Sequence, residues 1–187
     1  MSGRRRAAGP APGGGSPSRP LRALGEHRSL LGLVAAAVGE IISQRATLAG
    51  ASGGCQAECG AAAAMGAAAL CHMEGGSPEA CSHAVALAFK SILGLACDPV
   101  AGLVESPCVK RNGTLVSIGA IAADMALAGI RSIIPPDEVI DAMGDVGRAL
   151  PPSLRETARG GCALTPTGKA LTKKLNENRA EAGAAFV

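Results

Sequence analysis

Aromatic side chains are almost absent from this sequence: its 187 residues include no tryptophan, no tyrosine and two phenylalanines, Phe89 and Phe186. Proteins that bind single-stranded nucleic acids commonly stack bases on aromatic rings, so this composition argues against a nucleic-acid-binding function. Hydrophobic residues make up 48% of the chain, and the interior must be filled largely by alanine, glycine and aliphatic side chains. Because such small side chains fill space only when backbones approach closely, the composition favours packed helices over a β-sandwich.

Long apolar runs are also lacking. Residues 30–38 are apolar, but this stretch is much shorter than the roughly 20 residues that cross a bilayer, and Glu40 follows it. The N-terminal arginines are followed by glycine and proline instead of the apolar segment of a secretory signal. The seven cysteines are an odd number without the short, regular spacing of a disulfide framework. We therefore predict a reducing, cytoplasmic setting with no membrane partner.

Positive charge is concentrated at the N-terminus. The net charge is +3, but residues 1–28 contain six arginines and one acid and so carry +5, which leaves −2 for the rest of the chain. The basic character therefore belongs to a tail and does not indicate a nucleic-acid-binding body. This tail, rich in arginine, glycine and proline, is predicted to be disordered. Residues 29–170 form the predicted helical domain, and 171–187 a polar terminal helix or tail.

Helix signals recur along the rest of the chain and predict a single all-α domain of about seven helices. Ser77, Pro78 and Glu79, for example, provide a capping hydroxyl, a proline at the first helical position and an acid in the first turn. Apolar and polar residues rarely alternate, so no sheet is expected. Residues 51–54 are predicted to be a mobile loop. The expected helices are 30–48, 56–73, 77–95, 114–130, 139–150, 153–158 and 169–182, with a short helix or turn over 98–106.

Three of the cysteines share one local context. Cys55, Cys97 and Cys108 each lie beside glycine or proline, after a loop signal and before a predicted helical pattern. The partial positive charge at a helix N-terminus lowers the pKa of a thiol, so these sites are expected to favour thiolate, which binds iron–sulfur clusters and soft metals. We interpret them as the ligands of an iron–sulfur cluster with one iron left open. The alternative is ordinary buried cysteine, because none of the recurrent ferredoxin spacings is present.

The segments around these cysteines resemble the α chain of the iron–sulfur L-serine dehydratases. The resemblance covers roughly residues 33–171, and its cysteine-centred motifs are highly specific. These motifs are Gly53-Gly54-Cys55-Gln56-Ala57-Glu58, Leu95-Ala96-Cys97-Asp98-Pro99-Val100-Ala101-Gly102-Leu103-Val104-Glu105 and Pro107-Cys108-Val109-Lys110-Arg111-Asn112. Further similar stretches lie at 122–130, 134–135, 137–143, 156–158 and 165–168.

The resemblance implies a lyase. In that family three cysteines hold a [4Fe–4S] cluster and the fourth iron binds L-serine, so the resemblance assigns the ligands to Cys55, Cys97 and Cys108. The implied mechanism is Lewis-acid elimination, in which the open iron takes the substrate carboxylate and hydroxyl and makes hydroxide a better leaving group. A base, which the sequence does not identify, removes the α proton, and the resulting aminoacrylate hydrolyses to pyruvate and ammonia.

Polar residues beside the cysteines are weaker candidates. Lys110, Arg111 and Asn112 follow the third cysteine and are weak candidates for substrate binding; a solvated basic pair and a turn residue are the alternative. Gln56 and Glu58 lie in the first turn after the first cysteine, where either could contact the cluster or the substrate. Glu58 also fits as an acid at a helix N-terminus.

The remaining polar and sulfur side chains are interpreted as structural. Asp124 lies on an otherwise apolar helix, and we expect a buried acid held by a hydrogen bond. His83 is a weak candidate for the general base. A zinc site formed by the cysteines and histidines at 71–72 and 81–83 is disfavoured, because their spacing matches no standard zinc motif. Core or surface thiols are expected at Cys59, Cys71, Cys81 and Cys162.

The sequence departs from the family pattern in several places. A segment upstream of the first cysteine motif, which in the family helps to form the substrate pocket, is expected to be missing, as is a β chain or β domain. Ser52 stands where the family usually has an acid, Cys59 where it has a small aliphatic residue, and Cys162 where it has leucine. We therefore expect the cluster-binding portion of an α chain, with L-serine as substrate and a β chain or a second copy as partner. The alternatives are an inactive helical fragment and an iron–sulfur redox or sensor protein.

Overall fold

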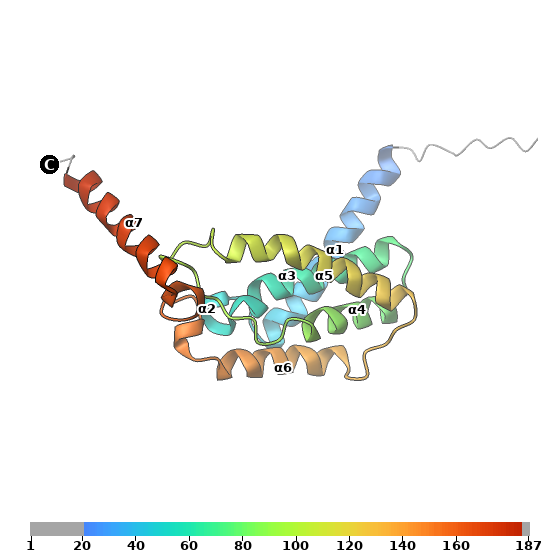
Figure 1. The fold of residues 1–187 in the computed structure, drawn as a ribbon. Coiled ribbons are helices and arrows are strands. Elements are labelled where there is room, and N and C mark those ends of the chain that lie inside the picture. The colour runs from blue at the N-terminus through green and yellow to red at the C-terminus, as the bar shows by residue number, and fades with distance from the viewer. Residues whose placement is uncertain (1–20, 185–187) are drawn as a thin grey trace, which may run out of the picture.

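The computed structural model describes residues 21–184, which form seven α-helices and two short 3-10 helices (Figure 1). No strand is present in this range, so the all-α prediction is confirmed. The predicted tail lies outside the described residues as far as residue 20, and α1 begins within its last part. The elements are α1 (Leu21–Arg45), α2 (Gly50–Gly53), α3 (Cys55–Met73), α4 (Pro78–Lys90), α5 (Cys108–Leu127), α6 (Pro136–Ala149), η1 (Pro152–Leu154), η2 (Gly161–Leu164) and α7 (Pro166–Ala184).

Helix α3 lies at the centre of the bundle. It packs against α1, α4 and α5, while α6 packs against α4 and α2. In Figure 1, α7 and the start of α1 extend beyond the bundle at opposite ends, and α7 contacts the rest through η2. None of the described helices is long and apolar enough to span a membrane.

Small side chains in α3 let its neighbours come close. Ala64, Ala67 and Ala68 are fully buried. In α5, a Cβ added to Gly119 would lie 2.9 Å from the backbone oxygen of Ala63, so the two helices approach with no room for a side chain at that point. The interior is therefore packed by close backbone approach, as expected of a chain so poor in aromatic residues.

One helix starts earlier than the sequence pattern indicates. Helix α5 begins at Cys108 instead of at residue 114, and it includes Asn112 and Gly113, which are typical turn residues. Both are exposed, so the main penalty is the low helix propensity of glycine, about 1 kcal/mol. Packing of buried residues such as Leu115 against α3 outweighs that penalty.

Other segments are less helical than predicted. Helix α4 ends at Lys90, short of the predicted end, and the turn after it leads to Gly94 with a φ of 88°. Residues 98–106, predicted to be a short helix or turn, form turns. The helix predicted over 153–158 is a single 3-10 turn, because two of its residues adopt positive φ angles that a right-handed helix does not allow.

Residues 51–54 are predicted from the sequence to be a mobile loop. They instead form most of the one-turn helix α2 and its C-cap residue, Gly54. Gly53 and Gly54 are buried. At Gly54, φ is 78° and an added Cβ would lie 2.8 Å from the backbone oxygen of Leu95. A Cβ at Gly147 of α6 would lie 2.8 Å from the Cα atom of Gly53. The prediction is wrong because these glycines serve close packing instead of flexibility.

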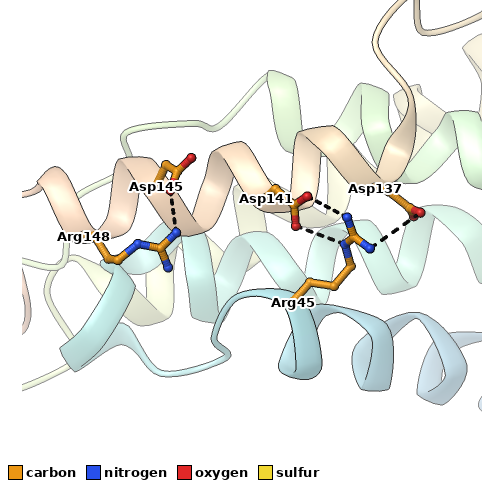
Figure 2. Close-up of polar contacts among 5 residues, drawn as sticks. All are labelled: Arg45, Asp137, Asp141, Asp145 and Arg148. Carbon is orange, nitrogen blue, oxygen red and sulfur yellow. Dashed lines mark hydrogen bonds and ion pairs between the residues drawn. The ribbon is translucent and has the colours of Figure 1, made fainter.

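An exposed network of ion pairs joins the end of α1 to α6 (Figure 2). The guanidinium of Arg45 donates to both carboxylate oxygens of Asp141, at 3.0 Å and 2.6 Å, and lies 3.8 Å from the carboxylate of Asp137. Arg148 pairs with Asp145 within α6. Exposed ion pairs contribute about 0–1 kcal/mol each, so the buried apolar side of α6 holds this helix in place more than the network does.

Candidate metal centre

Three cysteines from distant parts of the chain meet at one end of the bundle. The sulfur of Cys108 lies 3.6 Å from that of Cys55 and 3.7 Å from that of Cys97, and all three sulfurs lie within 4.8 Å of one another. Their exposed fractions are 0%, 1% and 4%, and all three are free thiols. Among residues 21–184, no other group of three or more metal-ligating side chains is gathered this closely.

Two of these cysteines begin a helix. Cys55 is the first residue of α3 and Cys108 the first residue of α5, so both sulfurs lie near the positive end of a helix dipole. Cys97 lies in the connection between α4 and α5. Its N–H donates to the carbonyl of Leu154 at 2.9 Å, and its carbonyl accepts from the N–H of Glu156 at 2.8 Å. The prediction that all three precede a helix is wrong for Cys97, because the residues after it turn.

Burial governs the protonation of the free thiols. Burial, followed by the neighbouring Cys55 thiol, raises the pKa of Cys108 to about 11, although the charge of Arg111 opposes the shift. Burial, followed by the thiols of Cys55 and Cys108, also raises the pKa of Cys97. The expectation of thiolate is therefore wrong for these two residues as free thiols, since one thiolate disfavours a second beside it. A metal cation reverses that preference because it stabilises coordinated thiolates.

Gln56 is fully buried directly behind the first cysteine. Its side-chain nitrogen donates to the carbonyls of Gly53 at 3.0 Å and Met143 at 3.2 Å, and its oxygen accepts from the N–H of Gly94 at 2.8 Å. The amide group therefore joins α3 to α6 and to the connection that carries the second cysteine. All three partners are backbone groups, so the Gln56 amide has a structural role, and no contact places it at a substrate.

The three polar residues after Cys108 point in different directions, as successive residues on a helix do. Arg111 turns toward the cysteines and is only 22% exposed. Lys110 is exposed and donates to the carbonyl of Glu105 at 3.2 Å. Asn112 is exposed and lines a cleft of about 330 Å³ between α3 and α5. The structure therefore brings only Arg111 of the three to the cysteine site.

Two carboxylates and the sulfur of Cys97 lie around Gly50. A Cβ added to Gly50 would lie 3.7 Å from this sulfur, 2.8 Å from a carboxylate oxygen of Glu58 and 3.5 Å from one of Glu156. Both acids are exposed, so they border the site on its solvent side. Glu58 is one of the candidates that the sequence indicates. Glu156 is missed by sequence reasoning, because it reaches the site through the backbone pairing of its segment with Cys97.

Two predicted polar residues lie elsewhere. Asp124 is exposed on α5, so the expectation of a buried acid is wrong; the helix is apolar on its outer side as well, and its pattern overstates burial. His83, in α4, accepts from the N–H of Ser132 at 3.3 Å and lies 3.9 Å from the carboxylate of Glu79. Neither partner belongs to the cysteine site, so the structure does not support His83 as a general base there.

The remaining cysteines behave as core or surface thiols. Cys59 is buried one turn after Cys55, and burial, followed by the neighbouring Cys55 thiol, raises its pKa to about 12. Cys71 and Cys81 are buried against each other, and Cys162 is exposed. Within the described residues, no histidine joins any of them in a metal-ligating group.

Comparison with known proteins agrees with the resemblance found in the cysteine motifs. The family model of the serine dehydratase alpha chain matches residues 26–163. The chain is 57% identical over 141 residues to the probable L-serine dehydratase, alpha chain, of Bacillus subtilis, covering 75% of this chain and 47% of that protein. It is 56% identical over 142 residues to the probable alpha chain of Latilactobacillus sakei, covering 75% and 68%. It is 50% identical over 141 residues to the L-serine dehydratase, alpha chain, of Peptoniphilus asaccharolyticus, covering 75% and 48%.

The matched part contains the complete cysteine site. All three clustered sulfurs and both flanking carboxylates fall within residues 26–163. The chain spans about half the length of the first and third of these relatives. The family model covers well over half of the chain. The chain belongs to the family of serine dehydratase alpha chains.

Proposed function

We propose that this chain is the cluster-binding portion of an iron–sulfur L-serine dehydratase, a lyase that converts L-serine to pyruvate and ammonia. One observation carries the proposal. Cys55, Cys97 and Cys108 lie within 4.8 Å of one another in a buried site, although the first and last are 53 residues apart. Relatives named L-serine dehydratase, alpha chain, are 50–57% identical over the part that contains this site.

The donor set fits a [4Fe–4S] cluster. Thiolates are the usual protein ligands of such clusters, and buried, unpaired cysteines are available at three corners of the site. We propose these three cysteines as the ligands, which leaves one iron of the cluster without a protein ligand. When bound, such a cluster supplies a Lewis acid that makes the serine hydroxyl a better leaving group.

The other residues of the site hold the ligands and accept a proton. Gln56 fixes the start of α3 against the connection that carries Cys97. Glu58 and Glu156 turn carboxylate oxygens toward the Gly50 position beside the Cys97 sulfur. We propose these carboxylates as the acceptors of the substrate's α proton, because they combine solvent access with proximity to the thiols.

A second polypeptide completes the pocket in this proposal. Val109, Val116 and Ile121 of α5 are 53%, 69% and 58% exposed. Exposed apolar surface of this kind is typical of contacts between proteins. We propose that a β chain or a second copy of this chain covers it, and that the assembly works in the cytoplasm on free L-serine.

Anaerobic reconstitution with iron and sulfide tests the proposal. We expect a brown protein with about four irons per chain, the content of one cubane cluster. Pyruvate is then measured in the same tube, first alone and then with a β chain added. Pyruvate formation supports the lyase.

A colourless chain would contradict the cluster. A brown chain that makes no pyruvate even with the added β chain would contradict the lyase and favour a redox or sensor protein.

A further inference from the structure

Arg111 reaches back from the first turn of α5 into the cysteine site. Its Nη1 atom lies 2.7 Å from the carbonyl oxygen of Ala96, 2.8 Å from a carboxylate oxygen of Asp98 and 3.6 Å from the sulfur of Cys55. One guanidinium nitrogen therefore contacts both sequence neighbours of Cys97 and the sulfur of another cysteine. The contacts join the start of α3, the start of α5 and the connection between α4 and α5.

Asp98 extends these contacts to a fourth segment. Its side chain is 5% exposed, and its second carboxylate oxygen accepts from the N–H of Cys162 at 2.6 Å. Burial alone would raise the pKa of Asp98, but the hydrogen bonds from Cys162 and the charge of Arg111 outweigh burial and lower it. A buried carboxylate needs such partners to stay ionised, so Arg111 and Asp98 depend on each other.

The same contacts make Arg111 a poor receptor for a substrate carboxylate. Binding there would displace a nearly water-excluded ion pair with Asp98 and the bond to the Ala96 carbonyl. Lys110 is free of that constraint, because it is exposed and makes one bond to a backbone carbonyl. Lys110 and Arg111 are neighbours in the sequence, but their positions on α5 give them different contacts.

We propose that Arg111 and Asp98 are positioning residues of the cysteine site, which hold the Cys97 connection in place and direct a positive charge at the Cys55 sulfur. The part that concerns a cluster rests on the proposed function. The part that concerns the connection holds for the metal-free chain as well. In both cases Arg111 acts through the cysteines and not on the substrate.

A charge at this position has a further consequence for a bound cluster. Coordinated thiolates carry negative charge, and a donor to one of their sulfurs stabilises the more reduced, more negative state. Removing the guanidinium charge should therefore lower the reduction potential of the cluster. It should also make the protein lose the cluster faster. Lysine at position 111 keeps the charge but lacks the planar guanidinium group that donates to several acceptors at once. It should therefore restore the reduction potential only in part.

Hydrogen exchange of the metal-free chain is the first test. The reporting amides are those of Cys97, Glu156 and Cys162, which bond respectively to a carbonyl of η1, to the Cys97 carbonyl and to Asp98. In Arg111→Gln we expect their exchange to be at least ten-fold faster, with the amides of α3 unchanged. Lys110→Gln is the matched control and should leave all of them unchanged. Unchanged exchange at all three amides in Arg111→Gln would overturn the proposal.

Reconstituted protein is the second test. We expect Arg111→Gln and Asp98→Asn to release iron to a chelator at least ten-fold faster than the wild type, Arg111→Lys to be intermediate and Lys110→Gln to match the wild type. Normal iron retention together with a raised KM for L-serine in Arg111→Lys would overturn the proposal and assign Arg111 to substrate.

If Arg111→Gln fails to fold, Asp98→Asn and Arg111→Lys decide by the same two measurements. If the wild-type chain takes up no iron, the proposed function fails, and hydrogen exchange still decides whether Arg111 and Asp98 position the connection.

Discussion

The two ends of α3 both bury cysteines, but they differ in what surrounds the thiols. At the first end, Cys55 meets two further cysteines from other segments. At the other end, Cys71 meets only Cys81, across the turn between α3 and α4. Both groups are shielded from water, and burial is the first cause of the raised pKa values at each, about 11 for Cys71. Burial of neighbouring thiols is therefore not what distinguishes a candidate metal site in this molecule.

Charge and the number of donors make the difference. The first end has three sulfurs, the start of two helices and the guanidinium of Arg111, all of which favour thiolates that are bound to a metal. Cys71 lies in the last turn of α3, where the helix dipole is negative and opposes a thiolate. Among the described residues, no third metal-ligating side chain joins the Cys71 pair. The comparison teaches that the number of gathered sulfurs and the local positive charge, and not burial, distinguish the candidate metal site from the structural pair.

Exchanging one cysteine for serine at each end should give the largest contrast. Cys97→Ser removes one of three sulfur donors, so we expect essentially complete loss of cluster iron after reconstitution. Cys71→Ser should retain the wild-type amount, because its thiol contributes only packing. Iron and sulfide per chain are the measurement. Bleaching by Cys71→Ser together with a normal cluster in Cys97→Ser would show that the ligands are assigned to the wrong end.

Removing the carboxylates at the first end should affect turnover without affecting iron. We expect the double variant Glu58→Gln with Glu156→Gln to lower kcat by roughly 10²–10⁴-fold, the usual contribution of a general base. Glu74→Gln, at the other end of α3, is the matched control and should leave kcat unchanged. Pyruvate formation by the complete assembly is measured alongside iron content. A double variant with wild-type kcat would exclude these carboxylates as the proton acceptors.

Two glycines with positive φ angles allow a comparison of stability. At Gly54 an added Cβ would meet Leu95 and Leu150 at 2.8 Å, whereas at Gly75 it would meet nothing within 4 Å. We expect Gly54→Ala to cost about 3 kcal/mol, from backbone strain and overpacking together, and Gly75→Ala about 1 kcal/mol from strain alone. Urea unfolding of the metal-free chain measures both. Equal costs would mean that the first end is no more tightly packed than the second.

Two glycines of α5 allow a second comparison of stability. Gly119→Ala should destabilise the fold by about 1–3 kcal/mol, because the new methyl group would press on the backbone of α3. Gly113→Ala should stabilise it by up to about 1 kcal/mol, because the site is open and alanine favours a helix. Thermal unfolding distinguishes the two by the sign of the shift in Tm. A stabilising Gly119→Ala would contradict the close approach of α3 and α5.

Sequence signals such as helix caps predict the fold well where the contact they make lies within a few residues. Ser77 caps α4 as expected, and its hydroxyl oxygen accepts from the N–H of Ala80 at 3.2 Å. Signals fail where long-range packing decides the outcome. Gly53 and Gly54 are typical of a loop, yet they form a buried contact with neighbouring elements. Asn112 lies within a helix because the residues after it pack on α3.

The candidate site is predictable in its sulfur atoms and not in its surroundings. The positions of Cys55, Cys97 and Cys108 beside helix and loop signals single them out from the other cysteines. The direction of Arg111 depends on where α5 begins, and the sequence pattern places that start too late. Glu156 reaches the site only because its segment pairs with the backbone at Cys97. No local pattern encodes either contact.

By itself, the sequence determined an all-α chain with closely packed helices and three cysteines suited to bind a soft metal. Helix propensity, capping and small side chains act over a few residues and can be recognised in any context. Only the tertiary structure decided that the three sulfurs meet within 4.8 Å, that Arg111 faces them and that two carboxylates border them. These contacts join residues separated by tens of positions, and they form because burial of the alanine-rich α3 brings its neighbours together.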